Sequence, residues 1–138
     1  MSRALETLAR LQRAQIDEAK TALAEIVNAR AMLAARDESL AAEIVHEQAQ
    51  AARDLAGVAA YGAYAPRVAR ERSMLSREDT RLALEEEAVR ARVADAYIEL
   101  KKIELLITTQ TERERAAENA RELAALDEAA AMRAARRS

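Results

Sequence analysis

A seven-residue apolar repeat in the second half of the sequence restricts the fold more than any other feature. The repeat consists of Val68, Leu75, Leu82, Val89, Ala96 and Ile103, and Val93, Leu100 and Ile107 form a companion series. A period of seven keeps one stripe of a helix facing a partner helix, as in a coiled coil. The second half is therefore predicted to form one long helix that packs along another.

The first half of the sequence carries a similar stripe with charged interruptions. Steps of three and four residues connect mostly apolar positions from Leu5 to Ala51, and Arg30, Asp37 and Glu47 interrupt them. Composition favours helices as well, because alanine, leucine, arginine and glutamate are strong helix formers. The chain lacks phenylalanine and tryptophan and has three tyrosines, so a thick core sealed by aromatic side chains is not expected.

One uncharged stretch, GVAAYGAYAP at residues 57–66, contains both glycines and the only proline. Inside a helix a glycine costs about 1 kcal/mol and a proline about 3 kcal/mol, so this stretch predicts a break. We predict an all-α fold in one domain, residues 1–138: a long antiparallel two-helix coiled-coil hairpin. Helix one spans about 3–56, the turn 57–65 and helix two about 66–135. A single continuous helix that dimerises in parallel is the alternative.

The two predicted arms differ in length. Pairing them about residue 60 places Leu5 near residue 115 and leaves roughly the last twenty residues without a partner from the first arm. Exposed apolar helix surface usually marks a binding site, so we predict a C-terminal helical overhang that binds a partner, with a frayed end as the alternative. The overhang carries apolar side chains at helical spacing and terminal arginines that suit the helix dipole, namely Leu123, Leu126, Met132, Arg133, Arg136 and Arg137.

Residue types that perform catalysis or hold metals are sparse in this chain. His46 is the only histidine and no cysteine accompanies it, so we predict a solvated side chain. The consecutive glutamates at residues 85–87 point in different directions on a helix and are predicted to be a solvated face. The sequence contains no glycine-rich phosphate loop and no plausible serine–histidine pair. We predict a non-enzyme with no cofactor and no metal.

Charge and hydropathy restrict the partners and the location. The 22 basic and 24 acidic residues are interspersed, which leaves no basic field to hold nucleic acid. The first residues carry no apolar signal core, and the uncharged stretch from Leu55 to Pro66 is shorter than the roughly 20 residues that span a bilayer. The absence of cysteine fits a reducing compartment. We therefore expect a soluble, cytoplasmic protein.

Tyr61 and Tyr64 lie in the uncharged stretch of a chain that has few aromatic residues. They either pack against each other and close the turn, or they anchor an interface, a role for which tyrosine is favoured. Both interpretations fit the sequence.

Three segments of the chain resemble one family. Tyr61-x-x-Tyr64 followed by Val68 and Leu75 looks like an aromatic entry into the second helix. The run AYIELKKIELL at residues 96–106 is a basic-then-glutamate stretch, and RELAALDEAAAMRAARR at residues 121–137 is a closing pattern. In all three respects the sequence resembles the FliJ family, small coiled-coil components of the bacterial flagellar export apparatus.

This resemblance implies a non-catalytic stalk or adaptor of flagellar type III protein export. FliJ-like proteins insert into the hexameric export ATPase ring (FliI-like), contact the cytoplasmic domain of the export gate (FlhA-like) and help to cycle export chaperones. The implied location is cytoplasmic and peripheral, at the cytoplasmic face of the inner membrane, with membrane contact only through the apparatus. A stalk of an injectisome and a self-associating structural coiled coil are the alternatives.

The resemblance also implies two sets of contact residues. The gate-binding positions fall on Tyr61, Tyr64, Val68, Glu71 and Leu75. The terminal segments would enter the ATPase ring, and they carry Leu5, Leu8, Leu123, Leu126, Met132, Arg133, Arg136 and Arg137.

Overall fold

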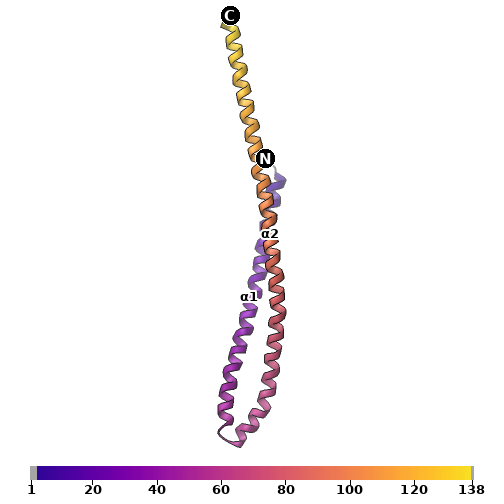
Figure 1. Cartoon of the computed structure of the whole chain (residues 1–138), viewed down its shortest axis with the longest axis vertical. Helices are drawn as coiled ribbons and strands as arrows, with labels where there is room; N and C mark the ends of the chain where they lie inside the picture. The colour runs from indigo at the N-terminus through magenta and orange to yellow at the C-terminus, as the bar shows by residue number, and fades with distance from the viewer. Residues whose placement is uncertain (1–2, 138) are drawn as a thin grey trace. The chain divides into compact units, whose positions relative to one another are not determined.

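Two long helices make up nearly all of the protein that the structure describes. The computed structural model describes residues 3–137. Helix α1 spans Arg3–Ala51 and helix α2 spans Leu55–Arg137. Figure 1 shows that the chain reverses direction between the two helices. The predicted all-α helical hairpin is confirmed.

The chain divides into two compact units, and both helices contribute to each. One unit, here called the terminal unit, contains α1 up to Ile16 and α2 from Asp95 onward. The other, here called the hairpin unit, contains Asp17–Ala94 and therefore the reversal of the chain. Each unit has its own apolar core.

The core of the hairpin unit is a narrow seam between α1 and α2. Leu40 and Val68 are almost fully buried, with 2% and 3% of their surface exposed. A further cluster consists of buried Ile26, Leu82 and Val89, with half-buried Leu23, Ala29, Leu33 and Val93 packed against it. Apart from Ala29, these positions belong to the seven-residue repeat of the second half or to the apolar stripe of the first half, so the two stripes identified the seam.

The core of the terminal unit is formed by the start of α1 and the middle of α2. Its buried members are Ala9, Ile16 and Leu100, and Ala96, Ile103 and Ile107 pack against them. The Gln12 side chain donates from Nε2 to the carbonyl oxygen of Ala96 at 3.1 Å. Together these contacts show that α1 covers α2 in this unit to about residue 107.

The pairing of the two arms is centred earlier than the sequence indicates. Gln12 bonds to Ala96, and Arg30 bonds to Asp79, so both pairs are centred near residue 54 rather than residue 60. The prediction that Leu5 lies near residue 115 is therefore wrong. As a consequence, the uncovered end of α2 is longer than the twenty residues expected.

The turn lies at residues 52–54 and is organised by Asp54. The Arg53 N–H donates to the carbonyl oxygen of Gln50 at 3.1 Å, which closes the last turn of α1. The Gly57 N–H donates to Asp54 Oδ1 at 2.6 Å. An aspartate that accepts a hydrogen bond from the third residue of a helix is an N-cap. Asp54 therefore determines where α2 begins.

The predicted turn at 57–65 is corrected by the structure, which shows these residues as part of α2. Neither Gly57 nor Gly62 has a positive φ. Pro66 lies inside α2 rather than at its start, and it has no N–H to donate to the carbonyl of Gly62. The Asp54 cap and the packing of α2 on α1 outweigh the helix penalties on which the prediction rested.

Gly57 and Gly62 are expected to respond oppositely to replacement by alanine. A Cβ on Gly57 would lie 2.6 Å from the Gln50 carbonyl oxygen and 3.1 Å from the Ala51 Cα, so the turn would have to shift. A Cβ on Gly62 meets nothing within 4 Å. Gly62→Ala should raise the free energy of unfolding by about 1 kcal/mol through helix propensity, and Gly57→Ala should lower it. Urea unfolding followed by circular dichroism tests this, and a shift of the same sign in both variants would contradict it.

Candidate functional site

The end of α2 is uncovered within the terminal unit. From residue 111 to residue 137 every side chain is exposed except that of Ala129, which is half-buried. Leu123, Leu126 and Met132 are 63%, 64% and 57% exposed. At 100° per residue Leu123 and Leu126 share one side of the helix, and Met132 lies on the opposite side from Leu123. We call residues 111–137 the exposed segment, and it confirms the predicted C-terminal overhang.

Three arginines lie at the far end of the exposed segment. Arg133, Arg136 and Arg137 are all exposed, and the last two belong to the final turn of α2. A helix C-terminus carries partial negative charge, so arginines stabilise this end and leave positive charge exposed there. The segment therefore combines apolar side chains with a basic end.

The two leucines predicted to act at the other end of the chain differ in exposure. Leu8 is 49% exposed, whereas Leu5 is half-buried. Ala9, next to Leu8 in the sequence, is buried in the core of the terminal unit. Leu8 is therefore the more accessible of the two leucines, and their contact with a partner stays a prediction.

The tyrosines near the turn pack against each other. The ring centroids of Tyr61 and Tyr64 are 6.3 Å apart with planes tilted by 41°, and the Arg67 guanidinium lies 5.7 Å from the Tyr64 centroid. Gln48 donates from Nε2 to the Tyr61 hydroxyl at 3.0 Å, which ties the start of α2 to the end of α1. These contacts support the interpretation that the tyrosines hold the turn closed.

The Tyr64 hydroxyl is buried, and within the described residues it has no hydrogen-bond partner. Burial raises the pKa of the Tyr64 phenol above its ordinary value, and the nearby carboxylates of Glu43 and Glu47 raise it further. The phenol therefore stays neutral and contributes apolar contact rather than charge.

The other predicted gate-binding residues are largely engaged inside the hairpin unit. Val68 is buried in the seam, so a partner reaches it only if the helices separate. Glu71 accepts a hydrogen bond from Arg36 Nε at 2.9 Å, and Leu75 is half-buried in a groove between the helices. Of the five positions, only the two tyrosines combine aromatic surface with partial exposure.

The sequence analysis missed an exposed apolar side of the first turns of α2. Leu55 is 87% exposed and Val58 is 56% exposed, and Met74 further along α2 is 64% exposed. Leu55, Val58 and Gly62 recur at steps of three and four and therefore lie on one side of the helix. The spacing of Leu55, Val58 and Gly62 is visible in the sequence. Because residues 57–65 were predicted to form a turn, this spacing was not recognised as one side of a helix.

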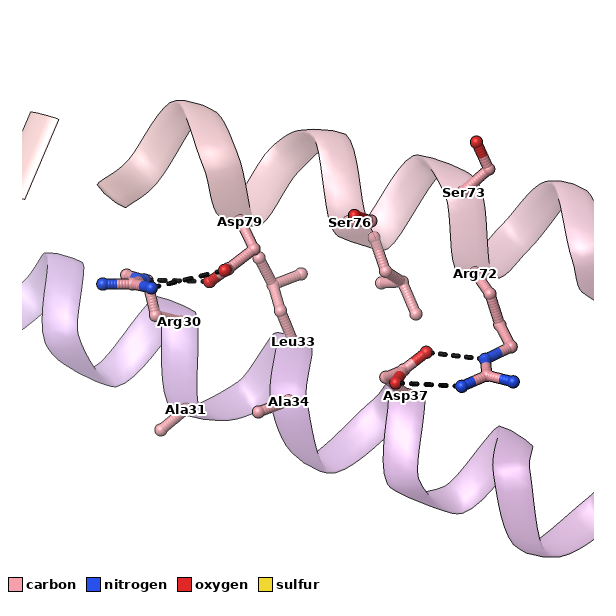
Figure 2. A pocket seen from close by; sticks show the side chains of 10 residues that line it. Arg30, Ala31, Leu33, Ala34, Asp37, Arg72, Ser73, Ser76 and Asp79 are labelled. Atoms are coloured by element: carbon pink, nitrogen blue, oxygen red, sulfur yellow. Dashed lines mark hydrogen bonds and ion pairs between the residues drawn. The ribbon is translucent and has the colours of Figure 1, made fainter. Parts of the chain in front are cut away.

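A groove of about 760 Å³ runs between α1 and α2 in the hairpin unit. Figure 2 shows an ion pair at each end of it and Leu33 between the pairs. Arg30 donates to Asp79 at 2.9 Å, and Arg72 donates to Asp37 at 2.8 Å. Arg30 and Asp37 were recognised in the sequence only as interruptions of an apolar stripe. Their partners follow from the series Val93, Leu100 and Ile107 continued back toward the turn.

Hydrogen bonds in the groove shift the acidity of two carboxyl groups. The bond from Arg72 lowers the pKa of Asp37 below its ordinary value of 3.8, and the bond from Arg30 does the same for Asp79. Both carboxylates are therefore ionised at neutral pH, and each is matched by an arginine from the opposite helix. The charged groups at the two ends of the groove are therefore already paired with each other.

Acidification is expected to weaken the hairpin through these two carboxylates. Because their folded pKa values lie below the unfolded ones, their contribution is present above about pH 4 and is lost as the pH falls through the folded values. Urea unfolding at pH 7 and between pH 4 and pH 2 measures the loss. The variant Asp37→Asn/Asp79→Asn should lose less stability on acidification, and an identical loss in variant and parent would contradict the assignment.

Other chemically active groups do not assemble in the described part of the chain. Within residues 3–137 no three histidine, aspartate or glutamate side chains gather closely enough to hold a metal ion. His46 is exposed, as predicted. Neither helix, over the same residues, offers an apolar stretch long enough to cross a membrane.

Two packed helices and a long exposed end define the class of protein as an all-helical hairpin. The comparison with protein families identifies it further. The model of the flagellar FliJ protein family matches residues 1–138, and the chain belongs to that family. Membership supports a role connected with flagellar protein export. Comparisons with curated proteins and with solved structures gave no match.

Proposed function

We propose that this chain is a non-catalytic stalk of the flagellar export apparatus that inserts into the hexameric export ATPase ring. The observation that carries the proposal is the exposed segment, in which Leu123, Leu126 and Met132 stand in solvent with no cover from α1. Family membership indicates the apparatus in which the chain would act, and the exposed segment offers an apolar surface that a partner would cover.

The distribution of side chains on the exposed segment suits a ring. Leu123 and Met132 point to opposite sides of one helix, so subunits on opposite sides of the helix would each meet an apolar side chain. Leu8 adds a further exposed apolar side chain at the start of α1. Arg133, Arg136 and Arg137 would contact acidic or carbonyl groups deeper in the ring.

The stalk would act on the ATPase without chemistry of its own. A bound protein shifts an equilibrium between ring conformations only by contacting them with different affinities. A slender helix that presents different side chains on each side makes unequal contacts with otherwise equivalent subunits. This asymmetry would favour one sequence of conformations in the ring.

The export gate and the export chaperones are proposed as the remaining partners. With Val68 buried and Glu71 paired to Arg36, the gate contact is assigned to Tyr61, Tyr64 and the neighbouring exposed Leu55 and Val58. The proposed location is cytoplasmic, at the inner face of the membrane that holds the gate.

The turnover rate of the hexameric export ATPase tests the proposal. Adding the purified chain should raise the rate in a saturable way, with half-saturation at a defined ratio of chain to hexamer. An unchanged rate across a hundredfold range of added chain would contradict the stalk function.

A further inference from the structure

The seam of the hairpin unit is charged where the neighbouring repeats are apolar. In α2 the series that is apolar at Val93 continues toward the turn as Glu86, Asp79 and Arg72. In α1 the stripe is charged at Arg30 and, seven residues on, at Asp37. Both helices therefore place charges of opposite sign one heptad apart in the interface.

The observed register pairs each of these charges with its opposite. Arg30 Nε is 2.9 Å from Asp79 Oδ1, and Arg72 Nε is 2.8 Å from Asp37 Oδ1. The polarity is reversed between the two pairs, since the arginine comes from α1 in the first and from α2 in the second. Reversed polarity makes the pairing sensitive to sliding of one helix along the other.

A seven-residue repeat permits slides of one heptad, because the same stripes still face each other. A slide in one direction would place Arg30 opposite Arg72, which is repulsive. A slide in the other direction would place Asp37 opposite Asp79, which is also repulsive, but it would bring Arg30 to Glu86. Arg30 Nη1 is already 3.5 Å from Glu86 Oε1. The second slide is therefore opposed by the Asp37–Asp79 repulsion and favoured by the Arg30–Glu86 pair.

The turn sequence also fits the second slide. A pair formed by Arg30 and Glu86 is centred on Val58, which lies between Gly57 and Gly62. These glycines, with Pro66, form the helix-weakening stretch that predicts a turn at 57–65, although the observed turn is at 52–54. The sequence thus holds a second turn site, displaced in the direction that the slide requires.

We propose that the hairpin has a second register one heptad away and that Asp37 keeps the chain from adopting it. In it Arg30 pairs with Glu86 and the turn moves to the segment around Gly57 and Gly62. The Asp37–Arg72 pair and the Asp37–Asp79 repulsion hold the chain in the observed register. Seven residues at 1.5 Å each move α1 by about 10 Å along α2. This inference does not depend on the identity of any partner.

A spin-label distance across the hairpin unit reports the register. The chain has no cysteine, so Ala42→Cys and Ala88→Cys, both exposed, accept nitroxides at these two sites alone. Pulsed electron paramagnetic resonance on the full chain should give one distance. Asp37→Arg should shorten it by about 10 Å, because the introduced guanidinium would repel Arg72 in the observed register and would face Asp79 after the slide.

The matched variant Asp37→Arg/Arg72→Asp restores an opposite pair in the observed register and keeps the pair with Asp79 after the slide, so the original distance should reappear beside the shorter one. An unchanged distance in Asp37→Arg overturns the proposal. If circular dichroism shows that Asp37→Arg does not fold, Asp37→Ala/Arg72→Ala removes the pair without repulsion. That variant should show both distances, and the longer distance alone overturns the proposal.

Discussion

Replacing Leu40 by alanine is expected to lower the free energy of unfolding by about 2–3 kcal/mol, the lower end of the range for core leucines. Leu40 is 2% exposed, the most completely buried large side chain in the described residues. The value falls at the lower end because a seam between two helices lets water or neighbouring side chains fill the space. Thermal and urea unfolding of the full chain measure the loss.

Leu84→Ala is the matched control for Leu40→Ala. Leu84 lies in the same unit and is 66% exposed, so its replacement should change stability by no more than about 0.5 kcal/mol. Equal destabilisation by the two variants would contradict the burial of Leu40 in the seam.

Replacing Leu123 and Leu126 together by serine is expected to weaken binding to the hexameric export ATPase by at least about a hundredfold. Burying a leucine is worth about 1.5–3 kcal/mol, and each 1.4 kcal/mol is a tenfold change in affinity. Both side chains are more than half exposed in the free chain and share one side of α2, so their loss should leave the hairpin intact. A titration of ATPase turnover against added chain measures the shift.

Leu84→Ser provides the comparison for this double variant, since Leu84 is similarly exposed but belongs to the hairpin unit. It should stimulate the ATPase like the parent chain. Full stimulation by Leu123→Ser/Leu126→Ser at the concentrations that suffice for the parent chain would show that the exposed segment does not make the proposed contact.

The helices were predictable because their signals are local and repeated many times. Strong helix formers fill both halves, and the stripe from Val68 to Ile103 recurs over six positions. The length difference between the arms also predicted that Leu123 and Leu126 would be uncovered, as they are.

The turn and the register were not predictable from the same signals. The helix penalties of Gly62 and Pro66 are visible in the sequence, but the Asp54 cap is a single hydrogen bond, and the close approach of Gly57 to Gln50 exists only after folding. A seven-residue repeat is compatible with several registers one heptad apart. The register that forms depends on which charged residues of the two helices meet in the seam. No local sequence pattern predicts this pairing.

The site prediction was least reliable where one residue was given two roles. Val68 begins the apolar repeat that forms the seam, so the same spacing that made it a core residue excluded it from the free surface. Tyr61 and Tyr64 were ambiguous for a physical reason, because an aromatic pair at a turn closes the fold and presents surface at the same time.

Hydrogen exchange of the full chain, alone and with the hexameric export ATPase, tests most directly whether residues 111–137 are an uncovered helix awaiting a partner. Most of the stability of a helix in a protein comes from packing, and an unpacked helix end opens with a lower free energy than a packed seam. In the free chain the amides of residues 111–137 should exchange much faster than those around Leu40 and Val68, and the ATPase should slow them. Equal protection of both regions in the free chain, or no change on adding the ATPase, would contradict the account.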